Sequence, residues 1–237
     1  MTAPDTLLVI PTYRDGARLV EFLPGLCAEL GRGPGGVLLQ VVDDGSPASE
    51  KLWLTTELDR LRREYALLQP LLAHDHNRGK GCAIRTGWSR GPHLRWLAFV
   101  DADGSAPAGE VRALLDRARR APTDAIYIAV RTAAPGKAVR RFGYRRLGSW
   151  VFNRWVRFWL RLEERDTQCG LKVLPASFFA GTAWREDRYA FDLELLIRAR
   201  AAGLPVEPQP ISWQEHAGSS LGPGAMLGLF AAVWRLR

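Results

Sequence analysis

Two aspartates separated by one residue follow directly on an apolar run. Asp101 and Asp103 come after Trp96–Val100, five apolar residues in the pattern of a buried strand. Carboxylates at positions i and i+2 that leave the end of one strand can reach the same divalent cation. Mg²⁺ and Mn²⁺ take oxygen ligands and usually keep coordination sites for water or substrate phosphates. The spacing therefore predicts a Mg²⁺ or Mn²⁺ site that holds a metal–diphosphate, although Asp-x-Asp also occurs in ordinary acidic turns.

Two further polar motifs also come directly after apolar runs. Pro11-Thr-Tyr-Arg14 follows Leu7–Ile10, and Asp43-Asp-Gly-Ser46 follows Val37–Val42. Apolar runs that alternate with helical patterns predict an α/β fold with a mostly parallel central sheet and helices on both faces. Binding sites in such sheets lie at the carboxyl ends of the strands. We therefore expect the three motifs to meet at one edge of the sheet.

The remaining elements of the first half are predicted from the same periodicities. The expected helices are 16–31, 48–66, 81–90 and 108–120, and the further expected strands are 67–72 and 125–130.

The composition excludes several classes of protein. With 237 residues, 47% of them hydrophobic, the chain can bury a substantial core. Three cysteines without a Cys-x-x-Cys pair argue against a disulfide framework or a thiolate zinc site. His74 and His76 are expected in a polar loop. We expect no signal peptide and no membrane-spanning helix, because no stretch approaches ~20 apolar residues.

Positive charge is concentrated in one segment. Residues 125–162 hold nine Lys and Arg and no Asp or Glu, so the net charge of +8 leaves the rest of the chain at −1. The same segment carries seven aromatic residues between Phe142 and Trp159. At helical spacing it has an apolar stripe and a basic stripe, made of Leu147, Val151, Trp155, Phe158 and Leu162, and of Arg154, Arg157 and Arg161, respectively.

A basic face beside an aromatic face is typical of a helix that lies in a membrane interface. We therefore expect residues 139–162 to contact a membrane surface. A core helix with a solvated charged face is the alternative. No nucleic-acid partner is expected, because the aromatic side chains fall on the apolar stripe rather than among polar groups.

Glycines precede the third expected helix. Asn77-Arg-Gly-Lys-Gly81 could be an ordinary helix cap, or its amides and Lys80 could attract an anion. Neither G-x-x-x-x-G-K-[ST] nor G-x-G-x-x-G occurs, so the two common glycine-rich phosphate loops are excluded.

Two later motifs complete an ordered series, Asp166-Thr-Gln-Cys-Gly-Leu-Lys172 and Ala190-Phe-Asp-Leu-Glu194. From about Leu7 to Leu221 the series resembles the family 2 inverting glycosyltransferases of GT-A fold. It is most similar to the dolichyl-phosphate β-glucosyltransferases and their bacterial polyprenyl-phosphate relatives. The resemblance implies one glycosyltransferase domain over residues 1–237, with a nucleotide-sugar-binding half (1–130) and an acceptor and membrane-interface half (131–237).

The resemblance also implies roles for individual residues. Asp101 and Asp103 match the metal ligands and, with Asp192, the catalytic residues. The acceptor phosphate would be bound by Arg131, Arg145 and Ser149. The nucleotide sugar would be bound by Pro11, Tyr13, Asp15, Val41, Asp43, Lys80, Ala102, Gln168 and Lys172.

The chain departs from the family pattern at three places, one of which is Ala129-Val-Arg131, where the family often has Gly-Ser-Arg. Ser105 stands where the mannosyl branch has a glutamine, which puts a third protein ligand to the metal in doubt. Ser220 stands where the family usually has a lysine, which weakens the case for diphosphate binding near the C-terminus.

The implied reaction is metal-dependent, inverting transfer of a hexose to a polyprenyl phosphate, most simply glucose from UDP-glucose. The implied location is peripheral, on the inner face of the cytoplasmic membrane. Two enzymatic alternatives stay open: another donor (GDP-mannose or a UDP-N-acetylhexosamine) and a soluble saccharide acceptor. A third alternative is a membrane- or nucleic-acid-binding protein on a degenerate nucleotide-binding fold.

Overall fold

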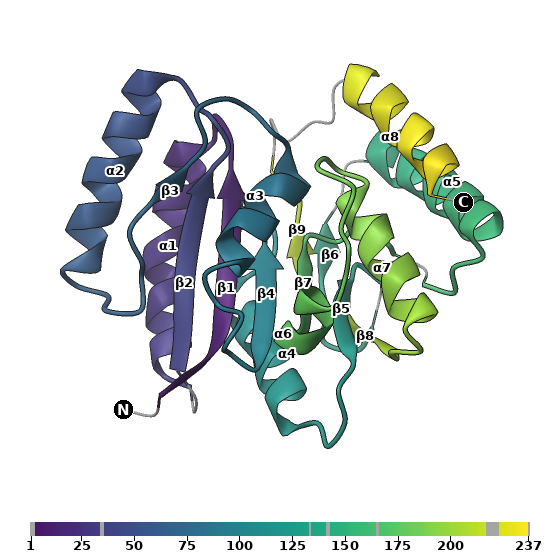
Figure 1. The fold of residues 1–237 in the computed structure, drawn as a ribbon, viewed down its shortest axis with the longest axis horizontal. Coiled ribbons are helices and arrows are strands. Elements are labelled where there is room, and N and C mark those ends of the chain that lie inside the picture. The colour runs from purple at the N-terminus through teal and green to yellow at the C-terminus, as the bar shows by residue number, and fades with distance from the viewer. Residues whose placement is uncertain are drawn as a thin grey trace.

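A seven-stranded sheet forms the centre of the protein (Figure 1), in the order β3-β2-β1-β4-β7-β5-β8. The computed structural model describes residues 3–33, 36–132, 134–140, 143–164, 166–216 and 223–236. Neighbouring strands are parallel except at β7, which runs antiparallel to both β4 and β5. A mostly parallel sheet with helices on both faces is therefore confirmed.

The strands are β1 (Pro4–Thr12), β2 (Gly36–Asp43), β3 (Leu72–Ala73), β4 (Trp96–Val100), β5 (Ile126–Val130), β6 (Val139–Arg140), β7 (Leu171–Pro175), β8 (Val206–Pro210) and β9 (Trp213–Gln214). Strands β6 and β9 pair in a separate two-stranded sheet. The helices are α1 (Gly16–Gly31), α2 (Ala48–Arg62), α3 (Lys80–Trp88), α4 (Ala108–Arg120), α5 (Gly143–Leu160), α6 (Ala176–Ala180), α7 (Phe191–Ala201) and α8 (Pro223–Arg235).

Alternation along the strands divides the apolar residues between two cores. In β1, Leu8 and Ile10 face a core shared with α1, α2 and α4, whereas Leu7 and Val9 face a core shared with α3, α7, α5 and α8. Period-two alternation puts successive side chains on opposite faces of a sheet. Strands β1 and β4 are therefore buried on both sides, which explains their almost unbroken apolar runs.

The expected third strand, 67–72, is wrong in its extent. The strand that pairs with β2 is only Leu72–Ala73. Leu68 makes an isolated bridge to Leu39. Pro70 stands between the two pairings, and it has no N–H to donate to a ladder, so a continuous strand is interrupted there.

Helices α5 and α8 lie side by side at one side of the molecule (Figure 1) and share a cluster of aromatic rings. The rings of Trp159 and Trp234 stack at 4.4 Å between centroids, and those of Trp155 and Phe230 lie at 4.9 Å. Within the described ranges, no helix is both long enough and apolar enough to cross a bilayer.

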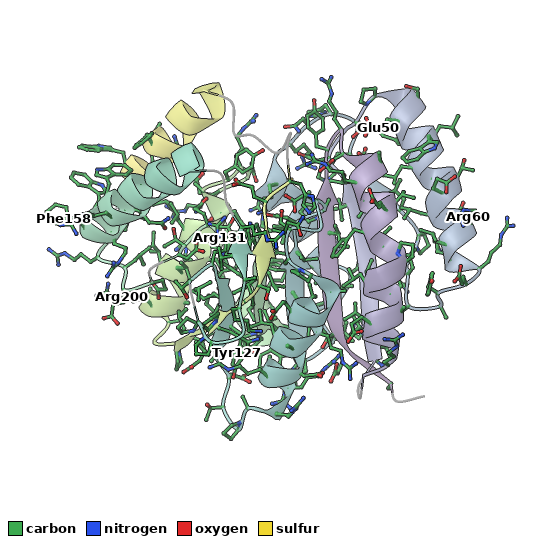
Figure 2. The ribbon with its side chains drawn as sticks, turned by 180° about the vertical axis from the view of Figure 1, so that it is seen from behind. Glu50, Arg60, Tyr127, Arg131, Phe158 and Arg200 are labelled. Carbon is green, nitrogen blue, oxygen red and sulfur yellow. The ribbon has the colours of Figure 1, made fainter. Side chains whose placement is uncertain are left out.

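The buried face of α5 differs from the expected stripe. Phe152 and Val156 are the buried side chains, whereas Phe158 is 82% exposed and points away from the body of the protein (Figure 2). Phe158 belongs to the apolar stripe that was expected to contact a membrane surface, and its side chain lies outside the protein core. Arg154, Arg157 and Arg161 are exposed, as the basic stripe requires.

Replacing Gly87 of α3 with Ala should destabilise the fold by about 1–3 kcal/mol, because the core there has no room for a methyl group. A Cβ at Gly87 would lie 2.6 and 2.7 Å from the two methyl carbons of Val9. Urea denaturation measures the change. Gly25→Ala in α1, where nothing lies within 4 Å, is the matched control and should stabilise by about 0.5–1 kcal/mol. Equal effects at both positions would contradict this account of the packing.

Candidate active site

Three neighbouring parallel strands deliver polar motifs to one edge of the sheet. Strand β1 pairs with β2 on one side and with β4 on the other, all in the same direction. Tyr13, Asp43 and Asp101 stand at or just beyond the carboxyl ends of these strands. The predicted convergence of the three motifs is therefore confirmed.

Asp43 presents an unpaired oxygen in a buried position. The residue is fully buried, and its Oδ2 accepts the backbone N–H of Ser46 at 3.0 Å. Its Oδ1 has no hydrogen-bond partner among the described residues. Because an unpaired buried acceptor costs free energy, a ligand N–H such as that of a nucleobase fits this position.

Tyr13 and Asp15 flank the same edge. Tyr13 is 40% exposed, with the Arg14 guanidinium 5.3 Å from its ring centre. Asp15 precedes α1 and accepts a hydrogen bond from Arg18 at 2.5 Å. Burial raises the pKa of Asp15 despite the arginine. An exposed ring beside a polar rim can stack on a planar base.

The other residues assigned to the nucleotide pocket are less accessible. Pro11 is half-buried at the end of β1, and Ala102 is 6% exposed between Asp101 and Asp103. Val41 is fully buried within the core on the α1 side. The side chain of Val41 therefore packs in the core, and the assignment of Val41 to the nucleotide pocket stays a prediction.

Asp101 and Asp103 form a compact two-carboxylate group. Asp103 Oδ1 accepts the N–H of Ser105 at 2.9 Å, and the Asp101 amide donates to the Gly170 carbonyl at 2.9 Å. Burial and then Asp103 raise the pKa of Asp101, with Lys80 opposing them. Two hard oxygen donors whose charges repel each other fit a divalent cation. In the described part of the chain, no group of three or more His, Cys, Asp or Glu converges as a metal site.

Gly170 makes room for the carboxylate of Asp101. A Cβ at position 170 would lie 1.8 Å from Asp101 Oδ2, closer than any real contact. Strand β7 runs antiparallel to β4 and brings Gly170 against the end of that strand. The glycine of the Asp166–Lys172 motif is thus required by close approach to Asp101, a role that the sequence did not reveal.

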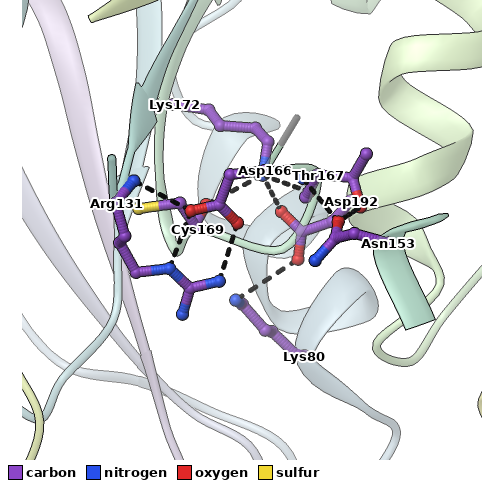
Figure 3. Close-up of polar contacts among 8 residues, drawn as sticks. All are labelled: Lys80, Arg131, Asn153, Asp166, Thr167, Cys169, Lys172 and Asp192. Carbon is purple, nitrogen blue, oxygen red and sulfur yellow. Dashed lines mark hydrogen bonds and ion pairs between the residues drawn. The ribbon is translucent and has the colours of Figure 1, made fainter. Parts of the chain in front are cut away.

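Lys80 pairs with both Asp101 and Asp192. Its Nζ lies 2.7 Å from Asp101 Oδ1. It also lies 3.4 Å from Asp192 Oδ2, a contact drawn in Figure 3. Lys172 pairs with the other oxygen of Asp192. The four side chains therefore form a row of alternating charge from β4 through α3 and α7 to β7.

The pairing within this row controls ionisation. Burial opposes the charge on Lys80, but Asp101 and Asp192 outweigh it and raise the pKa of Lys80 above its ordinary value. Burial likewise opposes the charge on Asp192, but Lys172 and then Lys80 hold the pKa of Asp192 below its usual range. An ionised carboxylate held by two ammonium groups is a weak proton acceptor and a strong electrostatic anchor.

Lys172 and Gln168 differ in accessibility. Lys172 is fully buried, and its ammonium also donates to the carbonyls of Cys169 at 2.8 Å and Thr167 at 3.2 Å. Lys172 therefore fixes Asp192 and the 167–169 turn, and its assignment to the donor pocket stays a prediction. Gln168 Nε2 is buried without a hydrogen-bond partner among the described residues, so it can still donate to a ligand.

Arg131 is held by Asp166 (Figure 3). Its guanidinium makes two hydrogen bonds to that carboxylate, at 2.8 and 2.7 Å, and its backbone N–H adds a third at 2.9 Å. The ring of Trp213 lies 5.1 Å from the guanidinium carbon. An acceptor phosphate would have to share Arg131 with Asp166. The side chains of Arg145 and Ser149 lie outside the described residues.

A buried network fixes the turn that leads into α3. Asp44 accepts the N–H groups of Arg78 at 2.9 Å and Gly79 at 2.7 Å, and lies 2.8 Å from His74 Nδ1. His74 Nε2 lies 2.9 Å from Thr86 Oγ1. His74 thus lies in the loop between β3 and α3, as expected, and is buried there among polar partners. The second aspartate of Asp43-Asp-Gly-Ser46, to which no role was assigned, positions the segment that carries Lys80.

A hollow of about 870 Å³ between α4 and β8 lies away from these motifs. Its charged lining is already paired, with Arg112 on Glu29 at 3.1 Å and Arg117 on Glu207 at 2.9 Å. The candidate site residues described above therefore lie at the strand edge and not in this hollow.

Asp166→Asn should lower the free energy of unfolding by about 3–5 kcal/mol near neutral pH, because buried Arg131 loses its counter-ion. Burial opposes ionisation of Asp166, but Arg131 outweighs it and holds the pKa of Asp166 below its ordinary value. The contribution of Asp166 is therefore complete above its unfolded pKa of about 3.9 and is lost as the pH falls through the folded pKa.

Chemical denaturation of both proteins over a range of pH measures this dependence. The difference in stability between wild type and Asp166→Asn should be constant from about pH 6 to 8 and should shrink below about pH 4. A difference that persists unchanged in acid would contradict the assignment of the ion pair.

Solved structures and curated relatives agree with this architecture. Glucosyl-3-phosphoglycerate synthase from Mycobacterium tuberculosis in complex with UDP superimposes with a TM-score of 0.71, over 99% of this chain and 80% of that one, at 13% identity. The same synthase in complex with Mn²⁺, UDP and phosphoglyceric acid gives a TM-score of 0.70 over 99% of this chain and 77% of that one, at 14% identity. These likenesses show the fold, which is that of the GT-A glycosyltransferases.

Sequence similarity is more specific. The chain is 30% identical to dolichyl-phosphate beta-glucosyltransferase of Drosophila melanogaster over 230 residues, 91% of this chain and 69% of the relative. It is 27% identical to the enzyme of the same name from Saccharomyces cerevisiae over 233 residues, 90% of this chain and 68% of the relative. The model of the family "Glycosyl transferase family 2" matches residues 7–182. The chain belongs to glycosyl transferase family 2 and is a glycosyltransferase.

Proposed function

We propose that the enzyme transfers glucose from UDP-glucose, with inversion, to the phosphate of a polyprenyl lipid. The observation that carries the proposal is the similarity, over nine tenths of the chain, to enzymes named dolichyl-phosphate beta-glucosyltransferase. The geometry of the strand edge supports it, because each part of a nucleotide sugar finds a chemically matched group there.

The donor would lie along the ends of β1, β2 and β4. The unpaired Oδ1 of Asp43 would accept a base N–H, and the exposed ring of Tyr13 would stack on the base. Pro11 and Asp15 would border the base and ribose, and Ala102 would touch the ribose or the diphosphate. Gln168 would donate to the sugar or phosphate through its unpaired Nε2.

Asp101 and Asp103 would hold Mg²⁺ or Mn²⁺. When bound, such an ion would neutralise charge that builds on the leaving diphosphate. Lys80, 2.7 Å from Asp101, would add a second positive charge on the same side. The relevant electrostatic groups are therefore in place before the reaction, which is how preorganised sites lower barriers.

The acceptor needs little help to become a nucleophile. A phosphate monoester has a second pKa of about 6 and is already anionic at neutral pH. One of its oxygens would bond to the anomeric carbon while the bond from that carbon to the diphosphate breaks, and UDP would leave with the electron pair. Arg131, with Arg145 and Ser149 as proposed partners, would position the phosphate; bidentate guanidinium contacts suit this role.

Asp192 is proposed as an anchor rather than as a base. Its pKa lies below the usual range, because Lys172 and Lys80 outweigh burial. A carboxylate so stabilised would hold a sugar hydroxyl or the nearby cations in place. Positioning and electrostatics would then supply most of the rate acceleration.

The enzyme would bind the inner face of the cytoplasmic membrane through a surface formed by α5 and α8. From there it would reach the lipid acceptor. Phe158, Trp234 and Phe230 are 82%, 64% and 41% exposed on these helices. The exposed arginines of α5 lie beside them. Exposed aromatic rings next to arginines match the acyl–headgroup boundary and anionic lipids, respectively.

A donor screen tests the reaction. Purified enzyme with Mn²⁺ and a short polyprenyl phosphate would be incubated with radiolabelled UDP-glucose, UDP-N-acetylglucosamine or GDP-mannose and extracted with organic solvent. Label should enter the organic phase from UDP-glucose, and Asp103→Asn should reduce the rate about 10³-fold or more, because several kcal/mol of charge stabilisation are lost. Label that is released in water as free glucose, with none in the organic phase, would refute the lipid acceptor.

A flotation assay tests the membrane surface. Replacing both Phe158 and Trp234 with Ser should reduce binding to vesicles that contain anionic lipid by about tenfold or more, because each buried aromatic side chain contributes ~1.5–3 kcal/mol. Leu52→Ser is the matched control: Leu52 is 71% exposed on α2, across the molecule from α5 and α8 (Figure 1). Equal loss in the control, or no loss in the double variant, would count against this surface.

A further inference from the structure

The loop between α6 and α7 packs directly on the first turn of α3, the helix that begins with Lys80. The amide of Cys82 donates to the carbonyl of Asp187 at 2.9 Å. A Cβ at Gly79 would lie 2.4 Å from that carbonyl oxygen, and one at Gly81 would lie 2.8 Å from the carbonyl oxygen of Glu186. The backbone of the loop therefore lies so close to the backbone at the start of α3 that only glycine fits at positions 79 and 81.

This contact caps the N-terminus of α3. The first amides of a helix have no partner within the helix. Helix α3 has no side-chain cap. Instead, the Cys82 amide donates to the carbonyl of Asp187, which lies more than a hundred residues further along the chain. The start of α3 is thus fixed by tertiary structure, and the position of Lys80 depends on where the loop lies.

Glu194 holds the loop. This residue of α7 is fully buried, and its carboxylate accepts the backbone N–H of Arg185 at 3.0 Å and that of Glu186 at 2.8 Å. Arg198 donates to the same carboxylate at 3.1 Å. Hydrogen bonds to an ionised acceptor are roughly twice as strong as neutral ones. One buried charge thus anchors two consecutive amides next to Asp187.

We propose that Glu194 is a positioning residue for the transfer reaction: it anchors the 185–187 backbone, which caps α3 and holds Lys80 between Asp101 and Asp192. The proposal rests on the proposed function only for its link to donor binding. It gives a role to the last residue of the Phe191-Asp-Leu-Glu194 motif. Within this motif, Asp192 contacts Lys80 directly, and Glu194 acts on Lys80 through the loop.

Glu194→Gln tests the anchor, because glutamine keeps the size but loses the charge and one acceptor oxygen. Amide hydrogen exchange at Cys82 should become about tenfold faster than in wild type, whereas amides of α4 should be unchanged. Asp187→Asn is the matched control, since it alters the loop side chain that pairs with Arg85 and leaves the capping carbonyl in place. If the Gln variant does not fold, Glu194→Asp keeps the charge near Arg198 but withdraws it from the loop.

A double-mutant cycle separates positioning from mere stabilisation. Calorimetry with UDP and Mn²⁺ should show about tenfold weaker binding for Glu194→Gln, and no further loss when Glu194→Gln is added to Lys80→Met. Equal losses in both backgrounds, or unchanged Cys82 exchange in a folded variant, would overturn the proposal. If wild type does not bind UDP with Mn²⁺, the proposed donor fails, and the exchange comparison still decides whether Glu194 anchors the loop.

Discussion

The ion pairs of Lys80 join parts of the chain that are far apart in sequence. Asp101 directly follows β4, Lys80 begins α3, and Asp192 lies in the first turn of α7. Breaking a buried charge pair leaves an uncompensated charge that costs far more than the pair gains. The row of alternating charges therefore specifies one relative placement of these three elements, and the site exists only in that placement.

The sheet topology makes this placement possible. Strand β7 enters antiparallel between β4 and β5, so the turn before it arrives at the edge where its parallel neighbours end. That turn carries Gly170 against Asp101 and Asp166 against Arg131. One reversed strand thus brings the second half of the chain to the carboxylates of Asp101 and Asp103, and the Asp166–Lys172 motif supports this edge of the sheet.

Local pattern was sufficient to predict part of the fold and of the site. The apolar runs that became β1, β2, β4 and β5 are buried on both faces, and the motifs after the first three were found from position alone. Features set by tertiary packing were not accessible in the same way. Lys172 was assigned to the donor pocket, and the sequence did not show that Asp192 and two carbonyls enclose its ammonium. His74 lies in a loop, as expected, but its burial against Asp44 was not predicted. The contact between α5 and α8 joins residues some seventy positions apart, which periodicity cannot show.

The central claim is that the ends of β1, β2 and β4 bind a metal–nucleotide. A crystal structure with UDP and Mn²⁺ tests this most directly, because an anomalous difference map locates the manganese. The account predicts a manganese peak shared by the carboxylates of Asp101 and Asp103, with the uracil N–H on Asp43 Oδ1. A manganese peak or a uracil ring bound elsewhere in the protein would contradict it.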